Sequence, residues 1–159
     1  MTTETSSLEL EIASPLVMHE LGIRLGRFLA KGDLVVLNGE LGAGKTTLTR
    51  GIGEGLGVRG TIASPTFLIA RTHETESGIR FNHIDAYRLS SPQELDDLDI
   101  DFANSISVIE WGKGFTDGIA SSWLSIDIDR SRADDVRLVK LSGFGSKFLD
   151  LEKVLGDAL

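Results

Sequence analysis

One short segment constrains the fold of this chain more than any other. It matches the phosphate-binding pattern G-x-x-x-x-G-K-S/T and reads Gly39-Glu40-Leu41-Gly42-Ala43-Gly44-Lys45-Thr46. The glycines allow backbone N–H groups to close around phosphate oxygens, the lysine reaches the β- and γ-phosphates, and the threonine hydroxyl reaches Mg²⁺. The pattern therefore predicts a nucleotide site that comprises Glu40, Leu41, Gly42, Ala43, Gly44, Lys45, Thr46 and Thr47.

The segments on either side of this loop agree with the prediction. Residues 34–37 form a short apolar run of the buried-strand type, and residues 46–56 are predicted to form a helix. The N-terminus of such a helix itself attracts anions. The alternative is a glycine-rich turn that binds nothing, and the agreement of loop, strand and helix disfavours it.

The rest of the chain predicts an α/β fold. Alternating or apolar runs predict strands at residues 8–12, 68–70, 79–84, 105–109, 123–128 and 136–141, with a hairpin between the second and third. Helices are predicted over residues 15–30, 92–98 and 144–155. We expect one domain spanning residues 1–159, with a P-loop NTPase-like three-layer fold. Its central sheet should be largely parallel, with additional antiparallel strands, and should bind ligand at the carboxyl ends of the parallel strands.

Composition excludes several classes of function. The net charge of −8 argues against a broad nucleic-acid-binding face, although it does not exclude nucleic acid reached through a partner protein. The absence of cysteine excludes disulfides and cysteine-ligated zinc. No apolar run approaches the roughly 20 residues of a membrane helix, and the polar, acidic residues 1–11 do not resemble a secretory signal. We expect no membrane association and a cytoplasmic location.

A P-loop needs an acidic partner that holds Mg²⁺ directly or through water. Glu110 ends the apolar run at residues 106–109, which is the Walker B pattern, and Asp85 ends the run at residues 81–84. A carboxylate at a strand end is also found as an ordinary surface residue, but the P-loop upstream favours a functional role for both. The acidic residues between 96 and 101 are interpreted as a solvated face.

Two further segments have open interpretations. Trp111 follows Glu110 directly and is either a rigid element that transmits the nucleotide state or a packed aromatic at a strand end. The Ser64-Pro65-Thr66 segment lies where a first switch loop is expected, so it either brings a hydroxyl to the γ-phosphate or Mg²⁺ or forms a simple proline turn. His83 falls inside a strand pattern and is interpreted as structural. The guanine-reading motif N-K-x-D is absent, which favours ATP over GTP.

Together these residues resemble the bacterial TsaE family of ATPases in tRNA threonylcarbamoyladenosine synthesis. The similar segments are the P-loop with Thr47, then residues 64–67, 83–89 and 108–111. The P-loop alone is shared by very many proteins, whereas the D-x-Y-R-L and I-E-W segments at these distances are much more specific. The resemblance covers nearly the whole chain.

The resemblance implies Mg²⁺-dependent hydrolysis of ATP to ADP. It implies that Lys45 contacts the phosphates, that Thr46 and Glu110 hold Mg²⁺, and that Asp85 and Trp111 are activity-critical neighbours. It also implies partners similar to TsaD and TsaB, with tRNA reached through that complex. Family members tend to carry an arginine near the nucleotide after a late strand, and the candidates are Arg130, Arg132 and Arg137.

Two rival functions stay open at this point. A small-molecule kinase would need an acceptor pocket and a closing lid, for which 159 residues leave little room. A non-catalytic module that binds nucleotide as a switch is the second rival, because a P-loop sequence does not separate slow hydrolysis from none.

Overall fold

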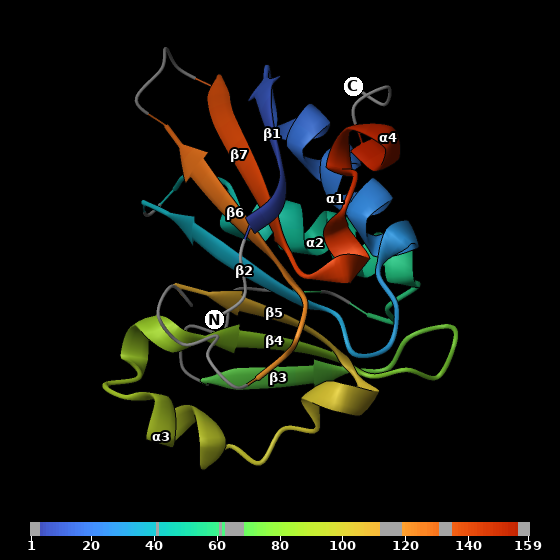
Figure 1. The fold of residues 1–159 in the computed structure, drawn as a ribbon, viewed down its shortest axis with the longest axis vertical. Helices are drawn as coiled ribbons and strands as arrows, with labels where there is room; N and C mark the ends of the chain where they lie inside the picture. The colour runs from blue at the N-terminus through green and yellow to red at the C-terminus, as the bar shows by residue number, and fades with distance from the viewer. Residues whose placement is uncertain are drawn as a thin grey trace.

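A twisted sheet runs through the middle of the molecule (Figure 1). The computed structural model describes residues 4–40, 42–60, 62, 69–111, 119–130 and 135–155. Within them the strands are β1 (Glu4–Ile12), β2 (Leu34–Gly39), β3 (Ala70–His73), β4 (Phe81–Asp85), β5 (Ile106–Glu110), β6 (Trp123–Asp129) and β7 (Arg137–Phe144). The helices are α1 (Pro15–Phe28), α2 (Lys45–Leu56), α3 (Pro92–Asp96) and α4 (Leu151–Leu155), with short 3-10 turns η1 (Ala86–Arg88), η2 (Phe102–Asn104) and η3 (Ser146–Phe148).

The sheet is mixed, and its parallel part lies at the centre. The strand order is β1-β7-β6-β2-β5-β4-β3. Strands β6, β2, β5 and β4 are parallel to one another, whereas β1 and β7 at one edge and β3 at the other pair antiparallel. This arrangement confirms the predicted fold class, including the hairpin formed by β3 and β4. None of the helices in the described residues is long and apolar enough to cross a membrane.

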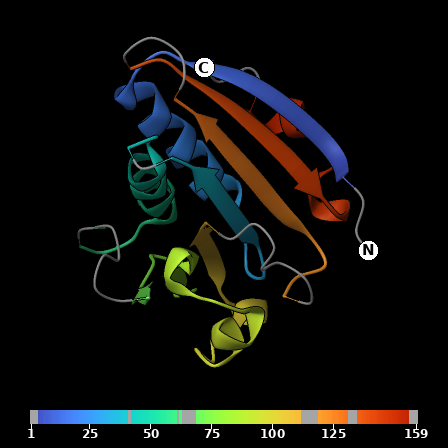
Figure 2. The same ribbon diagram turned by 90° about the vertical axis from the view of Figure 1, so that its left-hand side faces the viewer.

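Helices cover both faces of the parallel strands. Helices α1, α2 and α4 lie on one face together with the turn η3, whose Phe148 contacts Phe28 of α1, and α3 lies on the other face with η1 and η2 (Figures 1 and 2). Two hydrophobic cores lie on the two faces of the sheet, one beneath α1 and α2 and one beneath α3. Strand β2 contributes Val35 and Leu37 to the core beneath α1 and α2, and Leu34 and Val36 to the core beneath α3. Its continuous apolar run is therefore explained by burial on two faces, as expected for a central parallel strand.

Helix α1 begins as its sequence predicts. Ser14 is the N-cap, its side-chain oxygen accepts a hydrogen bond of 3.3 Å from the Val17 amide, and Pro15 occupies the first turn. Met18, Leu21 and Leu25 are buried in the core. The helix ends at Phe28, slightly earlier than predicted, because Leu29 is already extended.

Helices α1 and α2 approach each other through glycines, a contact that the local sequence pattern does not predict. A Cβ atom on Gly22 would lie 2.3 Å from the Leu48 carbonyl oxygen, and one on Gly51 would lie 2.2 Å from that of His19. Gly26 and Gly55 form a second contact of the same kind one turn further along. The exposed pair His19–Glu54 joins the same two helices. Backbone therefore packs on backbone, which fixes the position of the helix that follows the P-loop.

The prediction of a continuous helix over residues 144–155 is wrong. Strand β7 continues to Phe144 because it pairs with β1 on one side and β6 on the other up to that residue. Gly145, with φ of 92°, ends the strand and leads into η3, so only Leu151–Leu155 are α-helical. The predicted helix over residues 92–98 also ends early, at Asp96, and β3 begins at Ala70, whereas residues 63–68 lie outside the described ranges.

We expect Gly51→Ala to lower the free energy of unfolding by about 1–3 kcal/mol, because the new methyl group meets fixed backbone on α1. Alanine is otherwise the better helix former, so the loss would reveal the packing contact. Gly53→Ala on the same helix is the matched control, since its methyl group meets the flexible end of Ile62. Urea unfolding followed by circular dichroism measures both, and equal stability of Gly51→Ala and wild type would contradict the close contact.

Candidate functional site

A pocket of about 600 Å³ opens at the carboxyl ends of β2, β5 and β4. The sheet register brings its acidic residues together, since Leu37 in β2 pairs with Glu110 in β5 and Glu110 pairs with Asp85 in β4. The loop after β2 and the start of α2 form the opposite wall. The lining residues are Gly42, Gly44, Lys45, Thr46, Thr47, Asp85, Tyr87, Arg88, Glu110 and Trp111.

The loop adopts a conformation that requires glycine at two positions. Gly42 has φ of 81° and Gly44 has φ of 116°, both in the left-handed region. Gly44 is also the N-cap of α2, so the first amides of this helix lie at the pocket wall. Backbone amides at a helix N-terminus form a ready anion site. Leu41, which the sequence also assigned to the site, lies outside the described residues.

Lys45 is held inside this loop. Its ammonium donates hydrogen bonds to the carbonyl oxygens of Gly39 at 2.6 Å and Glu40 at 3.1 Å, and it lies 4.2 Å from the centre of the Trp111 ring. The residue is only 6% exposed. Burial lowers the pKa of Lys45 below its usual value, and the nearby carboxylates of Glu110 and Asp85 oppose that effect. Hydrogen bonds therefore hold the lysine at the point where the motif places phosphate, and the nearby carboxylates offset its positive charge.

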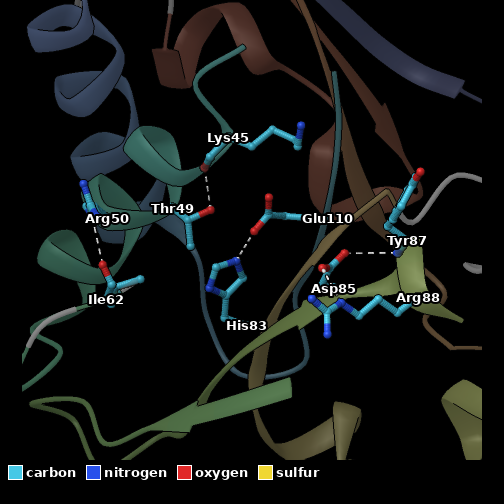
Figure 3. Close-up of polar contacts among 9 residues, drawn as sticks. All are labelled: Lys45, Thr49, Arg50, Ile62, His83, Asp85, Tyr87, Arg88 and Glu110. Atoms are coloured by element: carbon cyan, nitrogen blue, oxygen red, sulfur yellow. Dashed lines mark hydrogen bonds and ion pairs between the residues drawn. The ribbon is translucent and has the colours of Figure 1, made fainter. Parts of the chain in front are cut away.

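The two carboxylates differ in their surroundings. Glu110 is buried, and its Oε2 atom contacts Nε2 of the fully buried His83 (Figure 3). Asp85 is only partly buried and caps η1, where its Oδ1 accepts a hydrogen bond of 3.1 Å from the Tyr87 amide. The Arg88 Nε lies 3.9 Å from its Oδ2. Glu110 therefore lines the pocket with His83 as its described hydrogen-bond partner, while Asp85 also caps the turn η1.

Trp111 stands at a strained position beside these groups. Its φ of 62° is unusual for a residue other than glycine, and its amide donates a hydrogen bond of 2.7 Å to the Leu37 carbonyl oxygen. The ring lies 5.3 Å from that of Tyr87, which is 72% exposed. Strain of this kind is often found at functional sites. The contacts of Trp111 connect the buried lysine with an exposed aromatic residue.

The candidate arginines near the C-terminal strands differ in position. Arg137 of β7 donates a hydrogen bond of 3.1 Å from Nε to the Ala43 carbonyl oxygen of the loop. Arg130 lies beside Gly42, where a Cβ atom would come within 2.7 Å of its Nη1. Arg132 and residues 64–67, including the predicted switch segment, lie outside the described ranges. The nearest described residue before that segment, Ile62, accepts a 2.8 Å hydrogen bond from Arg50 of α2.

The donor set suits a magnesium ion shared with phosphate better than a protein-enclosed metal. Among the described residues, no group of three or more histidine, cysteine or acidic side chains is gathered for a metal. The pocket instead combines the hydroxyl residue Thr46 with the carboxylate of Glu110. Mg²⁺ is commonly held by one or two protein oxygens together with water and substrate phosphates.

Comparisons with known proteins agree on one family. The family model described as "Threonylcarbamoyl adenosine biosynthesis protein TsaE" matches residues 12–139. Proteins named tRNA threonylcarbamoyladenosine biosynthesis protein TsaE are 51% identical in Streptomyces coelicolor, covering 82% of this chain and 93% of that protein, and 42% identical in Mycobacterium leprae, covering 74% and 80%. The crystal structure of YdiB from Bacillus subtilis superposes with a TM-score of 0.74 at 25% identity, covering 99% of this chain and 95% of that one.

We expect Arg137→Gln to loosen the loop, because the charge-assisted hydrogen bond to Ala43 is lost. The measurement is hydrogen exchange at the Ala43 amide, which itself bonds to the Glu40 carbonyl oxygen at 3.0 Å. Exchange should become about tenfold faster, as expected for the loss of one hydrogen bond to a charged group. Lys140→Gln, at an exposed position of the same strand, is the control. Unchanged exchange at Ala43 would mean that Arg137 does not hold the loop.

Proposed function

This chain belongs to the TsaE family, and we propose that it is a Mg²⁺-dependent ATPase that supports tRNA threonylcarbamoyladenosine biosynthesis. In this proposal it acts as an accessory subunit of a complex with TsaD-like and TsaB-like proteins. One observation carries the enzymatic part: the P-loop lysine and a buried strand-end carboxylate, Lys45 and Glu110, line the same pocket. Members of the family are named for this biosynthesis, which supports the biological part.

The loop supplies the nucleotide-binding groups of the proposed site. Lys45 would contact the β- and γ-phosphates of ATP, exchanging its present contacts with Gly39 and Glu40 for phosphate oxygens. The amides at the start of α2 would contact the same phosphate chain. ATP is preferred to GTP in this proposal because the guanine-reading N-K-x-D motif is missing from the sequence.

Thr46 and Glu110 fit the role of magnesium-holding residues. Both line the pocket, and the Glu110 carboxylate is buried, so its charge is little screened by solvent. When bound, Mg²⁺ would supply charge stabilisation on the phosphoryl oxygens. Asp85 would add negative potential beside this pair, and Trp111 would keep Lys45 in place through its contact with the ammonium.

The pocket rim supports the partner-dependent part of the proposal. Arg88 lines the pocket but lies 3.9 Å from Asp85, which offsets its charge. An arginine that stabilises the transition state can raise phosphoryl-transfer rates by roughly 10³-fold or more. In this proposal a partner supplies or orders such a group, so we expect slow turnover alone and faster turnover with partners. The net charge of −8 favours contact with tRNA through the complex, and such a complex would act in the cytoplasm.

We expect Glu110→Gln to reduce ATP turnover by about 10²-fold while changing nucleotide affinity little, because the carboxylate acts on developing charge and the loop supplies most binding contacts. Phosphate release and calorimetric titration with a non-hydrolysable ATP analogue separate the two effects. Asp85→Asn is the matched comparison for the loss of a carboxylate. Lys45→Ala, in contrast, should lower the affinity for the nucleotide. Normal turnover in Glu110→Gln together with a defect in Asp85→Asn would show that Asp85, and not Glu110, is the carboxylate that acts on the metal.

We expect the nucleotide state to change affinity for a purified TsaB–TsaD-like pair, and partner binding to change nucleotide affinity by the same factor. Partner affinity is measured without nucleotide, with ADP and with the ATP analogue, and turnover is measured with and without the pair. Identical affinities in all three states, together with a partner-independent rate, would contradict the coupled-ATPase proposal. Stoichiometric phosphorylation of a small acceptor would favour a kinase instead.

A further inference from the structure

We propose that His83 is a positioning residue that holds one oxygen of the Glu110 carboxylate and thereby makes the site discriminate Mg²⁺ from Ca²⁺. This inference rests on the proposed nucleotide and magnesium site and extends it to a residue outside the pocket lining. The sequence pattern indicates only a structural role for His83, and the contact of its ring nitrogen with Glu110 gives it a more specific one.

His83 and Glu110 lie on neighbouring parallel strands and share one face of the sheet. Glu110 pairs with Asp85, two residues after His83, and side chains two residues apart point to the same face. Phe81 and Val108 come two residues before them on the same strands, so they point to the same face, and they belong to the core beneath α1 and α2. The histidine side chain is 0% exposed. The pair is therefore enclosed between the sheet and the helix that carries the P-loop.

The contact fixes which ring nitrogen carries the hydrogen. We assign His83 Nε2 as the donor and Glu110 Oε2 as the acceptor of this contact, because a carboxylate oxygen is an acceptor. The opposite nitrogen, Nδ1, is buried and has no hydrogen-bond partner among the described residues. A buried N–H without an acceptor is costly, so the hydrogen belongs on Nε2 and not on Nδ1 alone.

This donor leaves Glu110 with one oxygen for a cation. Figure 3 shows one carboxylate oxygen facing the His83 ring and the other directed away from it, on the side where Lys45 lies. Mg²⁺ requires near-octahedral geometry and accepts single carboxylate oxygens with water, whereas Ca²⁺ takes more ligands and often both oxygens of one carboxylate. By occupying Oε2, His83 favours the smaller ion.

The test compares three variants in a binding experiment. His83→Leu removes the donor at similar volume, His83→Gln keeps an N–H donor, and His19→Leu removes the other histidine–glutamate pair, which is exposed and joins α1 to α2. Calorimetry with the non-hydrolysable ATP analogue gives the nucleotide affinity in Mg²⁺ and in Ca²⁺ for each protein. Thermal unfolding shows that each variant is folded.

We expect the Mg²⁺-to-Ca²⁺ affinity ratio to fall about tenfold or more in His83→Leu, the scale at which partners of metal ligands act. His83→Gln should restore most of the ratio, and His19→Leu should keep the wild-type value. An unchanged ratio in folded His83→Leu, or an equal loss in His83→Gln, would overturn the proposal. A wild type whose nucleotide binding ignores divalent metal would refute the proposed function itself, and this inference with it, before any variant is compared.

A second measurement does not depend on the folding of any His83 variant. Nitrogen-15 NMR of the wild-type histidine rings should show the His83 hydrogen on Nε2, with a resonance that shifts in Glu110→Gln. A hydrogen on Nδ1 alone, or a resonance insensitive to Glu110→Gln, would overturn the proposal.

Discussion

The parallel pairing of β2 with β5 is the interaction on which the site depends. It places Glu110 beside Leu37, only two residues before the loop leaves the sheet at Gly39. Because β2 is buried on both faces, a slip by one residue would exchange its two apolar sets between unlike cores. The hydrophobic packing of β2 thus fixes the register of the sheet. This register sets the position of the Glu110 carboxylate relative to the P-loop.

Charge balance in the pocket explains why an anion and a cation would have to enter together. Lys45 is almost entirely buried, and its charge is compensated by Glu110 and Asp85. Burying any one of these charges alone would be costly, so their mutual attraction and the hydrogen bonds to Gly39 and Glu40 offset desolvation. A phosphate chain added to two carboxylates and one lysine brings excess negative charge. A divalent cation next to Glu110 reduces that excess, which is the physical reason for the proposed magnesium dependence.

Local signals in the sequence predicted most elements, and non-local contacts account for the rest. The P-loop with its strand and helix, the strand-end acids and the β3–β4 hairpin follow from patterns a few residues long. The missed features join distant residues: His83 and Glu110 are 27 positions apart, and Arg137 and Ala43 are 94 apart. The C-terminal helix was wrongly extended for the same reason, since pairing with β1, at the other end of the chain, keeps residues up to Phe144 in a strand.

The loop is fixed on one side and connected to an exposed residue on the other. Glycine contacts with α1 set the position of α2, and Arg137 of β7 holds the Ala43 carbonyl, so two separate parts of the chain restrain the phosphate-binding backbone. On the opposite side, Trp111 bonds to β2 through its amide, contacts Lys45 with its ring and lies beside the exposed ring of Tyr87. A protein that packs on Tyr87 would therefore act on the lysine through a single aromatic residue. Because the coupling free energy between two binding events is reciprocal, a phosphate that draws Lys45 towards itself would change the affinity for that protein by the same factor.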